Sequence, residues 1–234
     1  MQKRLLWVLI VCLALVGIIL FVWRPKGQDD FDHWMTVGAG YLEKGEGTNA
    51  IVAYSKAVNF SPESIAAHLN LANAYLLAES NQEAVVQCQQ AINLDHNNPA
   101  AYYLLGCAYL HLNQATQAVE AFQQSQKIDP AVTALNFQLG LAQERLGNLE
   151  DAIHEFETVI QFEPEHPSAH YQLSRLYQRA GRDAEAAQEL AKHQQIQGKS
   201  PSPAPGGAME SAGIGVERTK QNGRQSLCET EGRS

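Results

Sequence analysis

The chain has 234 residues, of which 45% are hydrophobic, and a formal net charge of −8 at pH 7. Residues 31–197 contain nineteen Asp or Glu against eight Lys or Arg, a net charge of −11, and such a field repels nucleic acid phosphates. The four cysteines show no metal-ligand spacing. Composition therefore predicts neither a nucleic-acid partner nor a metal cofactor.

Residues 5–23 form a run of nineteen positions without a charge near the amino terminus. At about 1.5 Å per residue, a helix of that length crosses most of a hydrocarbon layer of about 30 Å. Trp7 and Trp23 lie near the two ends of the run, where indole rings are favoured at membrane interfaces. A cleaved signal peptide has a shorter apolar stretch and an A-x-A-like site, and neither is present. The sequence predicts an uncleaved transmembrane helix at 5–23.

The charges that flank this run indicate its orientation. Lys3, Arg4 and the terminal amine precede it, and Arg24 and Lys26 follow it. By the positive-inside rule this favours cytoplasmic residues 1–4, a linker at 24–30 and repeats outside the inner membrane, which in a bacterium means the periplasm. The margin is one charge, so a cytoplasmic position of the repeats stays open.

Residues 31–197 repeat a pattern of small and large side chains every 34 residues. One register is held by alanines: Ala50, Ala84, Ala118, Ala152 and Ala186. A second register of small residues lies twelve positions upstream: Gly38, Ala72, Gly106, Gly140 and Ser174. Four positions after each alanine stand Tyr54, Cys88, Phe122, Phe156 and Leu190. A period of this length is typical of stacked helical hairpins.

This pattern resembles the tetratricopeptide repeat, in which a bulky residue, Leu-Gly and Tyr are followed by Ala, an aromatic residue and Pro. Residues 34–41 and 102–109 match its first half well, while Gln143, His96 and Gly198 depart from it. The resemblance implies an all-α, right-handed superhelical solenoid of helix-turn-helix repeats. The five units are 31–64, 65–98, 99–132, 133–166 and 167–197.

Within each unit, two short helices are expected to cross closely at the small residues. The first should run for about 14 residues, roughly 21 Å. Turns are predicted near Gly45, Asn113, Gly147 and Gly181, and proline ends the second helix because it lacks an N–H and clashes with the preceding turn. One hairpin cannot bury its apolar stripe alone, so stability must come from neighbouring hairpins.

The resemblance also implies which residues face a concave groove, because the first helices of such arrays line the concave side. The predicted partner-binding residues are Leu69, Asn73, Leu76, Tyr103, Cys107, Leu110, Phe137, Leu141, Arg145, Tyr171, Arg175 and Arg179. Arginine suits carboxylates, since its planar donors can bind both oxygens. We therefore expect an apolar peptide or helix with an acidic group near its end. Alternatively, the apolar residues pack against neighbouring hairpins and the arginines pair with Glu144 or Glu185.

Candidate chemical motifs are weak. His166 and His170 have the spacing of a metal pair, but Pro167 marks a helix start between them, which places His166 outside the helix. Gly198-Lys199-Ser200 lacks the earlier glycine of a phosphate-binding loop. We expect no catalytic residue, no cofactor and no small-molecule substrate, so the chain is not predicted to be an enzyme.

Residues 198–234 are rich in Pro, Ser and Gly and cannot bury a core, so they are predicted to be a disordered tail. Together these features predict a single-pass, membrane-anchored protein–protein interaction scaffold that acts in cell-envelope assembly. One alternative is an accessory subunit of an enzyme or transport complex whose catalytic part is on another chain. Another is a scaffold that self-associates through its open ends.

Overall fold

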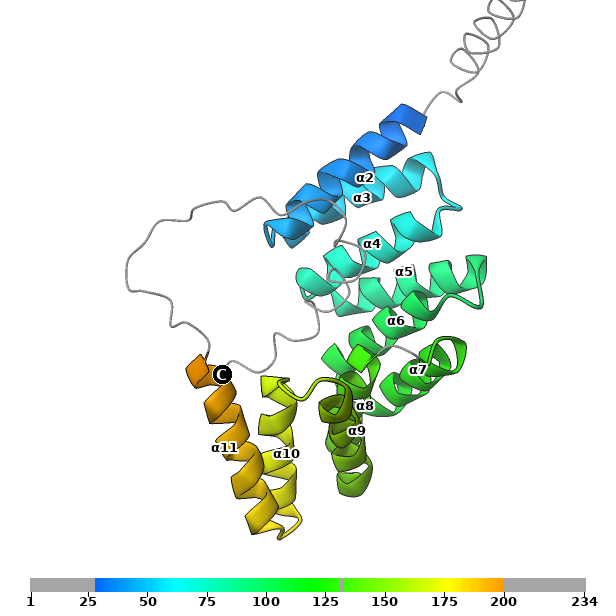
Figure 1. Ribbon diagram of the computed structural model, residues 1–234. Helices are drawn as coiled ribbons and strands as arrows, with labels where there is room; N and C mark the ends of the chain where they lie inside the picture. Colours follow the sequence, from blue (N-terminus) through cyan, green and yellow to red (C-terminus); the bar gives the residue numbers. More distant parts are fainter. Residues whose placement is uncertain (1–27, 131–132, 200–234) are drawn as a thin grey trace, which may run out of the picture.

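The computed structural model describes residues 28–130 and 133–199, and these form ten helices and no strand (Figure 1). Successive helices pair as hairpins. The pairs are α2 (Gln28–Glu43) with α3 (Gly47–Phe60), α4 (Ile65–Leu77) with α5 (Asn81–Leu94), α6 (Pro99–His111) with α7 (Ala115–Ile128), α8 (Thr133–Leu146) with α9 (Leu149–Phe162), and α10 (Pro167–Arg179) with α11 (Asp183–Lys199).

The hairpins stack in chain order into a curved array (Figure 1). The second helix of each hairpin packs against the first helix of the next, from α3 with α4 to α9 with α10. First helices also touch each other directly, α2 with α4, α4 with α6, and α6 with α8. This arrangement confirms the all-α solenoid.

The predicted transmembrane helix at 5–23 and most of the predicted tail lie outside the described residues. Within the ranges 28–130 and 133–199, no helix is both long enough and apolar enough to span a bilayer. The membrane anchor therefore stays a prediction from the sequence.

Both ends of the array extend slightly beyond the predicted boundaries. Helix α2 begins at Gln28, inside the expected linker 24–30, and acidic residues in its first turns favour the positive end of the helix dipole. Helix α11 continues through Gly198 to Lys199, beyond the expected end at residue 197. In other units, proline follows the second helix at positions 62, 130 and 164 and stops it. The last unit has Gly198 at this place, and because glycine weakens a helix by only about 1 kcal/mol, α11 continues.

The two helices of three hairpins cross where a glycine meets an aromatic ring. These pairs are Gly38 with Tyr54, Gly106 with Phe122 and Gly140 with Phe156. A Cβ added at Gly106 would lie 2.5 Å from Cε1 of Phe122, closer than real Cβ contacts allow. The rings are fully buried or nearly so, and they therefore fix how closely the helices approach.

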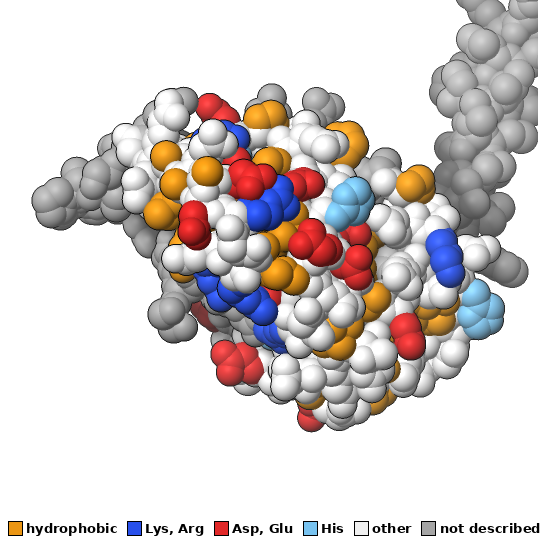
Figure 2. Space-filling view, turned by 90° about the horizontal axis from the view of Figure 1, so that it is seen from below, with side chains coloured by type: hydrophobic (Ala, Val, Ile, Leu, Met, Phe, Trp, Pro, Cys, Tyr) orange, Lys and Arg blue, Asp and Glu red, His pale blue; other side chains and the backbone are white. Residues whose placement is uncertain are grey.

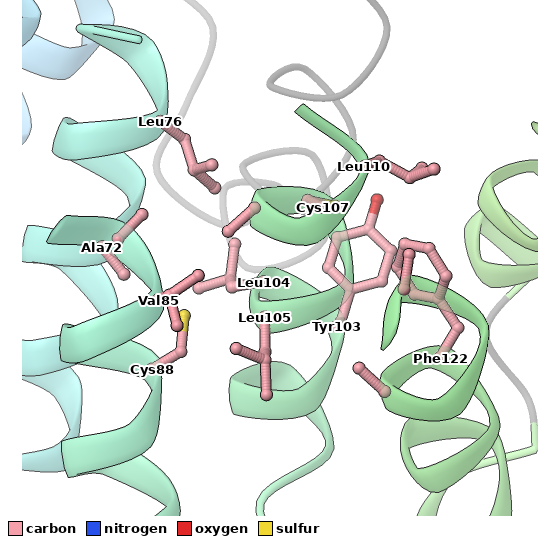
Figure 3. Packing of buried hydrophobic residues seen from close by; sticks show 14 of the residues in the cluster. Ala72, Leu76, Val85, Cys88, Tyr103, Leu104, Leu105, Cys107, Leu110 and Phe122 are labelled. Carbon is pink, nitrogen blue, oxygen red and sulfur yellow. The ribbon is translucent and has the colours of Figure 1, made fainter. Parts of the chain in front are cut away.

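In the other two hairpins, the same two positions carry a different combination. Ala72 and Ser174 replace glycine, and the residues at the aromatic position are Cys88 and Leu190. Figure 3 shows Ala72 and Cys88 close together in the core. Cys88 is a free thiol, and burial raises its pKa to about 12. A side chain with a Cβ on the first helix thus accompanies a non-aromatic residue on the second.

The largest hydrophobic cluster extends across α4, α5, α6, α7 and α8. Its middle is helix α6, whose residues contact hairpins on both sides, with Leu104 and Leu105 near Val85 and Tyr103 near Phe122 (Figure 3). The rings of Tyr103 and Phe122 lie 5.9 Å apart. Since one cluster joins helices of three hairpins, these hairpins stabilise one another as the repeat pattern predicts.

A left-handed residue lies in the turn of each hairpin. These residues are Gly45, Glu79, Asn113, Gly147 and Gly181, with φ values between 57° and 80°. Four of the five turns were predicted from glycine or asparagine, the residues that adopt this conformation most readily. Glu79 was missed because its side chain carries no such signal. Glu79 lies 34 residues from both Gly45 and Asn113, so it occupies the same place in its turn as they do in theirs.

We predict that Gly106→Ala destabilises the protein by about 1–3 kcal/mol, because the new methyl group and the Phe122 ring require the same space. The same substitution should cost much less in a Phe122→Leu background, which approximates the combination of Ser174 and Leu190. Urea denaturation of the four chains of this double-mutant cycle measures the coupling. An equal cost in both backgrounds would show that the close crossing is not responsible.

Candidate functional site

The predicted partner-binding residues lie on four first helices, three on each of α4, α6, α8 and α10. Five of their apolar side chains are buried, with exposed fractions of 0–8%: Leu76, Tyr103, Cys107, Leu110 and Phe137. Leu69 and Leu141 are partly buried and pack against the same clusters. These contacts agree with the alternative in which apolar residues pack between hairpins, and a role in partner binding stays a prediction for them.

The residues at the carboxyl-terminal end of this surface are exposed. Tyr171 is 44% exposed, and the side chains of Arg175 and Arg179 are 46% and 49% exposed. All three lie on helix α10 at successive spacings of four residues, which places them on one helix face. Figure 2 shows this end of the array, where basic side chains lie beside acidic and hydrophobic ones.

Both of these arginines converge on one carboxylate from the preceding hairpin. Oε1 of Glu144 on α8 lies 3.0 Å from Nη1 of Arg179 and 3.5 Å from Nη2 of Arg175. Arg175 also donates a hydrogen bond to Oε1 of Gln172 at 2.9 Å. The alternative in which the arginines pair with Glu144 is thus confirmed, but two positive charges share one negative charge. The cluster keeps a net charge of +1.

Arg145 has a structural contact that the sequence did not predict. Its Nη1 donates a hydrogen bond to the carbonyl oxygen of Leu110 in the last turn of α6. A cation at this end of a helix is favoured by the helix dipole. Arg145 therefore links the third and fourth hairpins.

Two amide side chains on the first helices contain a buried oxygen without a hydrogen-bond partner among the described residues. They are Oδ1 of Asn73 and Oε1 of Gln138. Leaving such an atom unpaired costs about 1–3 kcal/mol. Asn73 was among the predicted partner-binding residues, and its Oδ1 is covered by the protein. Gln138 was not predicted, because its position in the repeat lies outside those expected to face the groove.

Three ring nitrogens of the two histidines considered as a metal pair, Nδ1 of His166 and both of His170, are engaged in hydrogen bonds. Nδ1 of His166 accepts from the backbone N–H of Ala169 at 3.1 Å and caps α10. His170 is 2% exposed, with Nδ1 2.5 Å from Oε2 of Glu189 and Nε2 2.9 Å from the carbonyl oxygen of Pro164. In the described part of the chain, no group of residues could hold a metal ion.

His170 has a counterpart three repeats earlier in the chain, and the partner of that histidine is an uncharged amide. Nδ1 of His68 lies 2.8 Å from Oε1 of Gln87, and its Nε2 lies 2.9 Å from the carbonyl oxygen of Pro62. The last hairpin keeps this geometry but replaces the amide by Glu189. A carboxylate accepts hydrogen bonds, so Nδ1 of His170 donates to an ionised Glu189.

The Glu189 carboxylate also interacts with Lys192, whose Nζ lies 2.8 Å from Oε1. Burial alone would raise the pKa of Glu189, but the hydrogen bonds and positive charges of Lys192 and His170 outweigh burial and lower it. Sequence reasoning missed this pair. The signal that could have found it is the 19-residue spacing shared by His68 with Gln87 and His170 with Glu189.

Two family models match the sequence. The tetratricopeptide repeat domain of cytochrome c-type biogenesis protein H matches residues 25–135, and a general tetratricopeptide repeat model matches residues 144–203. No curated protein sequence matches significantly.

Several solved structures share the fold. MamA from Desulfovibrio magneticus RS-1, residues 41 to the end, has a TM-score of 0.68 and 20% identity, over 74% of this chain and 98% of that one. PilF from Pseudomonas aeruginosa has a TM-score of 0.65 and 22% identity, over 73% and 78%. YrrB, described as a tetratricopeptide repeat protein with an unusual peptide-binding site, has a TM-score of 0.58 and 23% identity, over 71% and 86%. At these identities the likeness concerns the fold alone.

We predict that Glu189→Gln folds, because it reproduces the arrangement of His68 and Gln87, but is less stable than the wild type by about 1–2 kcal/mol at pH 7. The pKa of Glu189 is lower in the folded chain than its ordinary value of 4.5, so the unfolded chain binds more protons as the pH falls. The stabilisation is therefore present above about pH 4.5 and is lost below it.

Urea denaturation between pH 3 and pH 7 measures this difference, which should shrink as the pH falls below 4.5. Glu185→Gln is the matched control, because Glu185 forms an exposed pair with Arg182 and its removal should change stability much less. A difference between wild type and Glu189→Gln that does not depend on pH would contradict the ionic interaction.

Proposed function

The chain belongs to the tetratricopeptide repeat family, and from this premise we propose that it is a protein–protein interaction scaffold whose first helices bind a segment of a partner. The observation that carries the proposal is the pair Arg175 and Arg179, half exposed on one face of α10 and sharing a single carboxylate. Positive charge is scarce in this acidic domain. An acidic group on the partner would neutralise the remaining positive charge of this cluster.

The neighbouring side chains favour an apolar segment next to that acidic group. The exposed ring of Tyr171 lies beside His193, with 5.4 Å between ring centroids, and the guanidinium carbon of Arg175 is 5.9 Å from the Tyr171 ring. Rings in such a position offer apolar contact area to a ligand. Leu69 on α4 and Leu141 on α8 are partly buried on first helices of earlier hairpins. The partner segment is therefore apolar, with an Asp or Glu near one end.

A binding role agrees with the causes of the shifted pKa values. Burial raises the pKa of Tyr54 to about 12, and Arg182 lowers that of Glu185 through a hydrogen bond. Packing and ion pairing account for these shifts, so neither residue needs a catalytic role. An accessory subunit of an enzyme or transport complex is a second candidate, since the same surface could hold a catalytic chain.

Residues 5–23 are the proposed membrane anchor. Because α2 begins at Gln28, four residues separate the proposed span from this helix. Such a short connection would keep the repeats next to the bilayer. The match to a repeat domain of cytochrome c-type biogenesis protein H favours assembly of c-type cytochromes among the possible envelope pathways.

We predict that reversing two charges, Arg175→Glu with Arg179→Glu, lowers capture of the partner by about tenfold or more, because the partner's acidic group loses its attractive contacts and meets repulsion. The measurement is affinity capture with the full-length chain solubilised from membranes, followed by mass spectrometry. Lys127→Glu, on the second helix α7, is the control for a change of charge.

Circular dichroism of both variants confirms that the helices remain. Equal capture by the wild type and the double variant would contradict the proposed binding surface. Recovery of a c-type cytochrome precursor or an assembly factor would support the proposed pathway, and recovery of a catalytic subunit would support the second candidate.

A further prediction concerns the anchor. The full-length chain should stay in the membrane fraction after carbonate extraction, whereas a chain lacking residues 1–24 should be released, because it has lost the apolar run. In spheroplasts, added protease should digest the repeats of the full-length chain if they lie outside the inner membrane. Protection until the membrane is broken would instead establish the cytoplasmic orientation.

A further inference from the structure

The position of Glu144 in the repeat is unusual for a charged residue. Leucine occupies the same register in the first three hairpins, at Leu42, Leu76 and Leu110. Leu76 and Leu110 are buried, with 4% and 3% exposed. The Glu144 side chain is 15% exposed, so a carboxylate has replaced a packing residue at a largely covered place. Such a carboxylate loses hydration and needs compensation.

Two guanidinium groups from the next hairpin supply that compensation at a single oxygen. Arg179 and Arg175 both reach Oε1 of Glu144, and both side chains remain about half exposed. A guanidinium has five N–H donors, so each arginine keeps donors for another acceptor. The cluster therefore resembles a carboxylate site whose present occupant comes from the protein itself.

We propose that Glu144 is the internal occupant of this site and that an Asp or Glu side chain of the partner binds Arg175 and Arg179 by displacing it. The side-chain source is favoured over a chain terminus because the occupant in the structure is itself a glutamate side chain. The identity of the partner rests on the proposed function. The exchange of one carboxylate for another depends only on Glu144, Arg175 and Arg179.

Internal competition makes Glu144 a determinant of specificity. A ligand carboxylate must compete with one held at high local concentration, so a carboxylate alone binds weakly. A segment that also places apolar side chains against the neighbouring helices gains the additional interaction that displacement requires. Glu144 therefore discriminates against isolated acidic groups in favour of acidic groups within an apolar segment.

The test uses a small carboxylate and the full-length chain in detergent. N-acetylaspartate N-methylamide is titrated at constant ionic strength while the side-chain N–H signals of Arg175 and Arg179 are followed in a spectrum of ¹⁵N-arginine-labelled protein. We expect Glu144→Gln to bind this probe on the order of fivefold to tenfold more tightly than the wild type. Glu120→Gln, an exposed acid on α7, removes the same charge and should behave as the wild type.

Equal affinities of the wild type and Glu144→Gln, or arginine signals that do not respond in the variant, would overturn the proposal. Tighter binding of N-acetylalanine, which carries a terminal carboxylate, would overturn the assignment to an acidic side chain. The signal of Arg182 is an internal reference, because its partner is Glu185. Since the titration requires no protein partner, its failure is distinguishable from failure of the affinity capture.

Discussion

The close contact between the two helices of each hairpin is the constraint on which the rest of the array depends. Where the first helix has glycine, as at Gly106 and Gly140, an aromatic ring of the second helix occupies the space that a Cβ would need. Where the first helix has Ala72 or Ser174, the second helix has no aromatic residue at that position. The residues at these two positions therefore pack as a pair, and their combined size limits how closely the two helices approach.

Stacking of the hairpins places their first helices side by side, and these helices form a continuous surface. Each second helix packs on the next first helix, and one hydrophobic cluster extends from α4 to α8. Direct contacts among α2, α4, α6 and α8 bring the first helices together along one side of the array. Residues 34 positions apart consequently occupy equivalent places on neighbouring hairpins. This equivalence allows Leu110 to be compared with Glu144, and His68 with His170.

Sequence periodicity predicted the hairpins because packing and turn positions recur with the covalent repeat. Gly45, Gly147 and Gly181 identify turns by their own conformational preference, whereas Glu79 adopts the same φ through its place in the hairpin. The burial of Tyr103 was not predicted, because the repeat pattern places this residue on the groove side, whereas its ring packs beside that of Phe122 in the same hairpin. The contacts of Glu144 with two arginines depend on how α10 is placed against α8, which one repeat does not specify.

Substitutions at equivalent places also explain why the two ends of the array differ electrostatically. The pair His68 and Gln87 is neutral at its amide, whereas His170 and Glu189 introduce a buried carboxylate with Lys192 beside it. Glu144 occupies a register that holds an uncharged residue in the other hairpins, and Glu189 occupies one that holds alanine or glutamine in the first three. In both clusters cations lie beside the carboxylate. Because the helix framework is unchanged, such replacements alter charge without altering the fold. A solenoid can therefore concentrate basic residues at one end of an acidic domain, and under the proposed function this asymmetry would orient the bound segment.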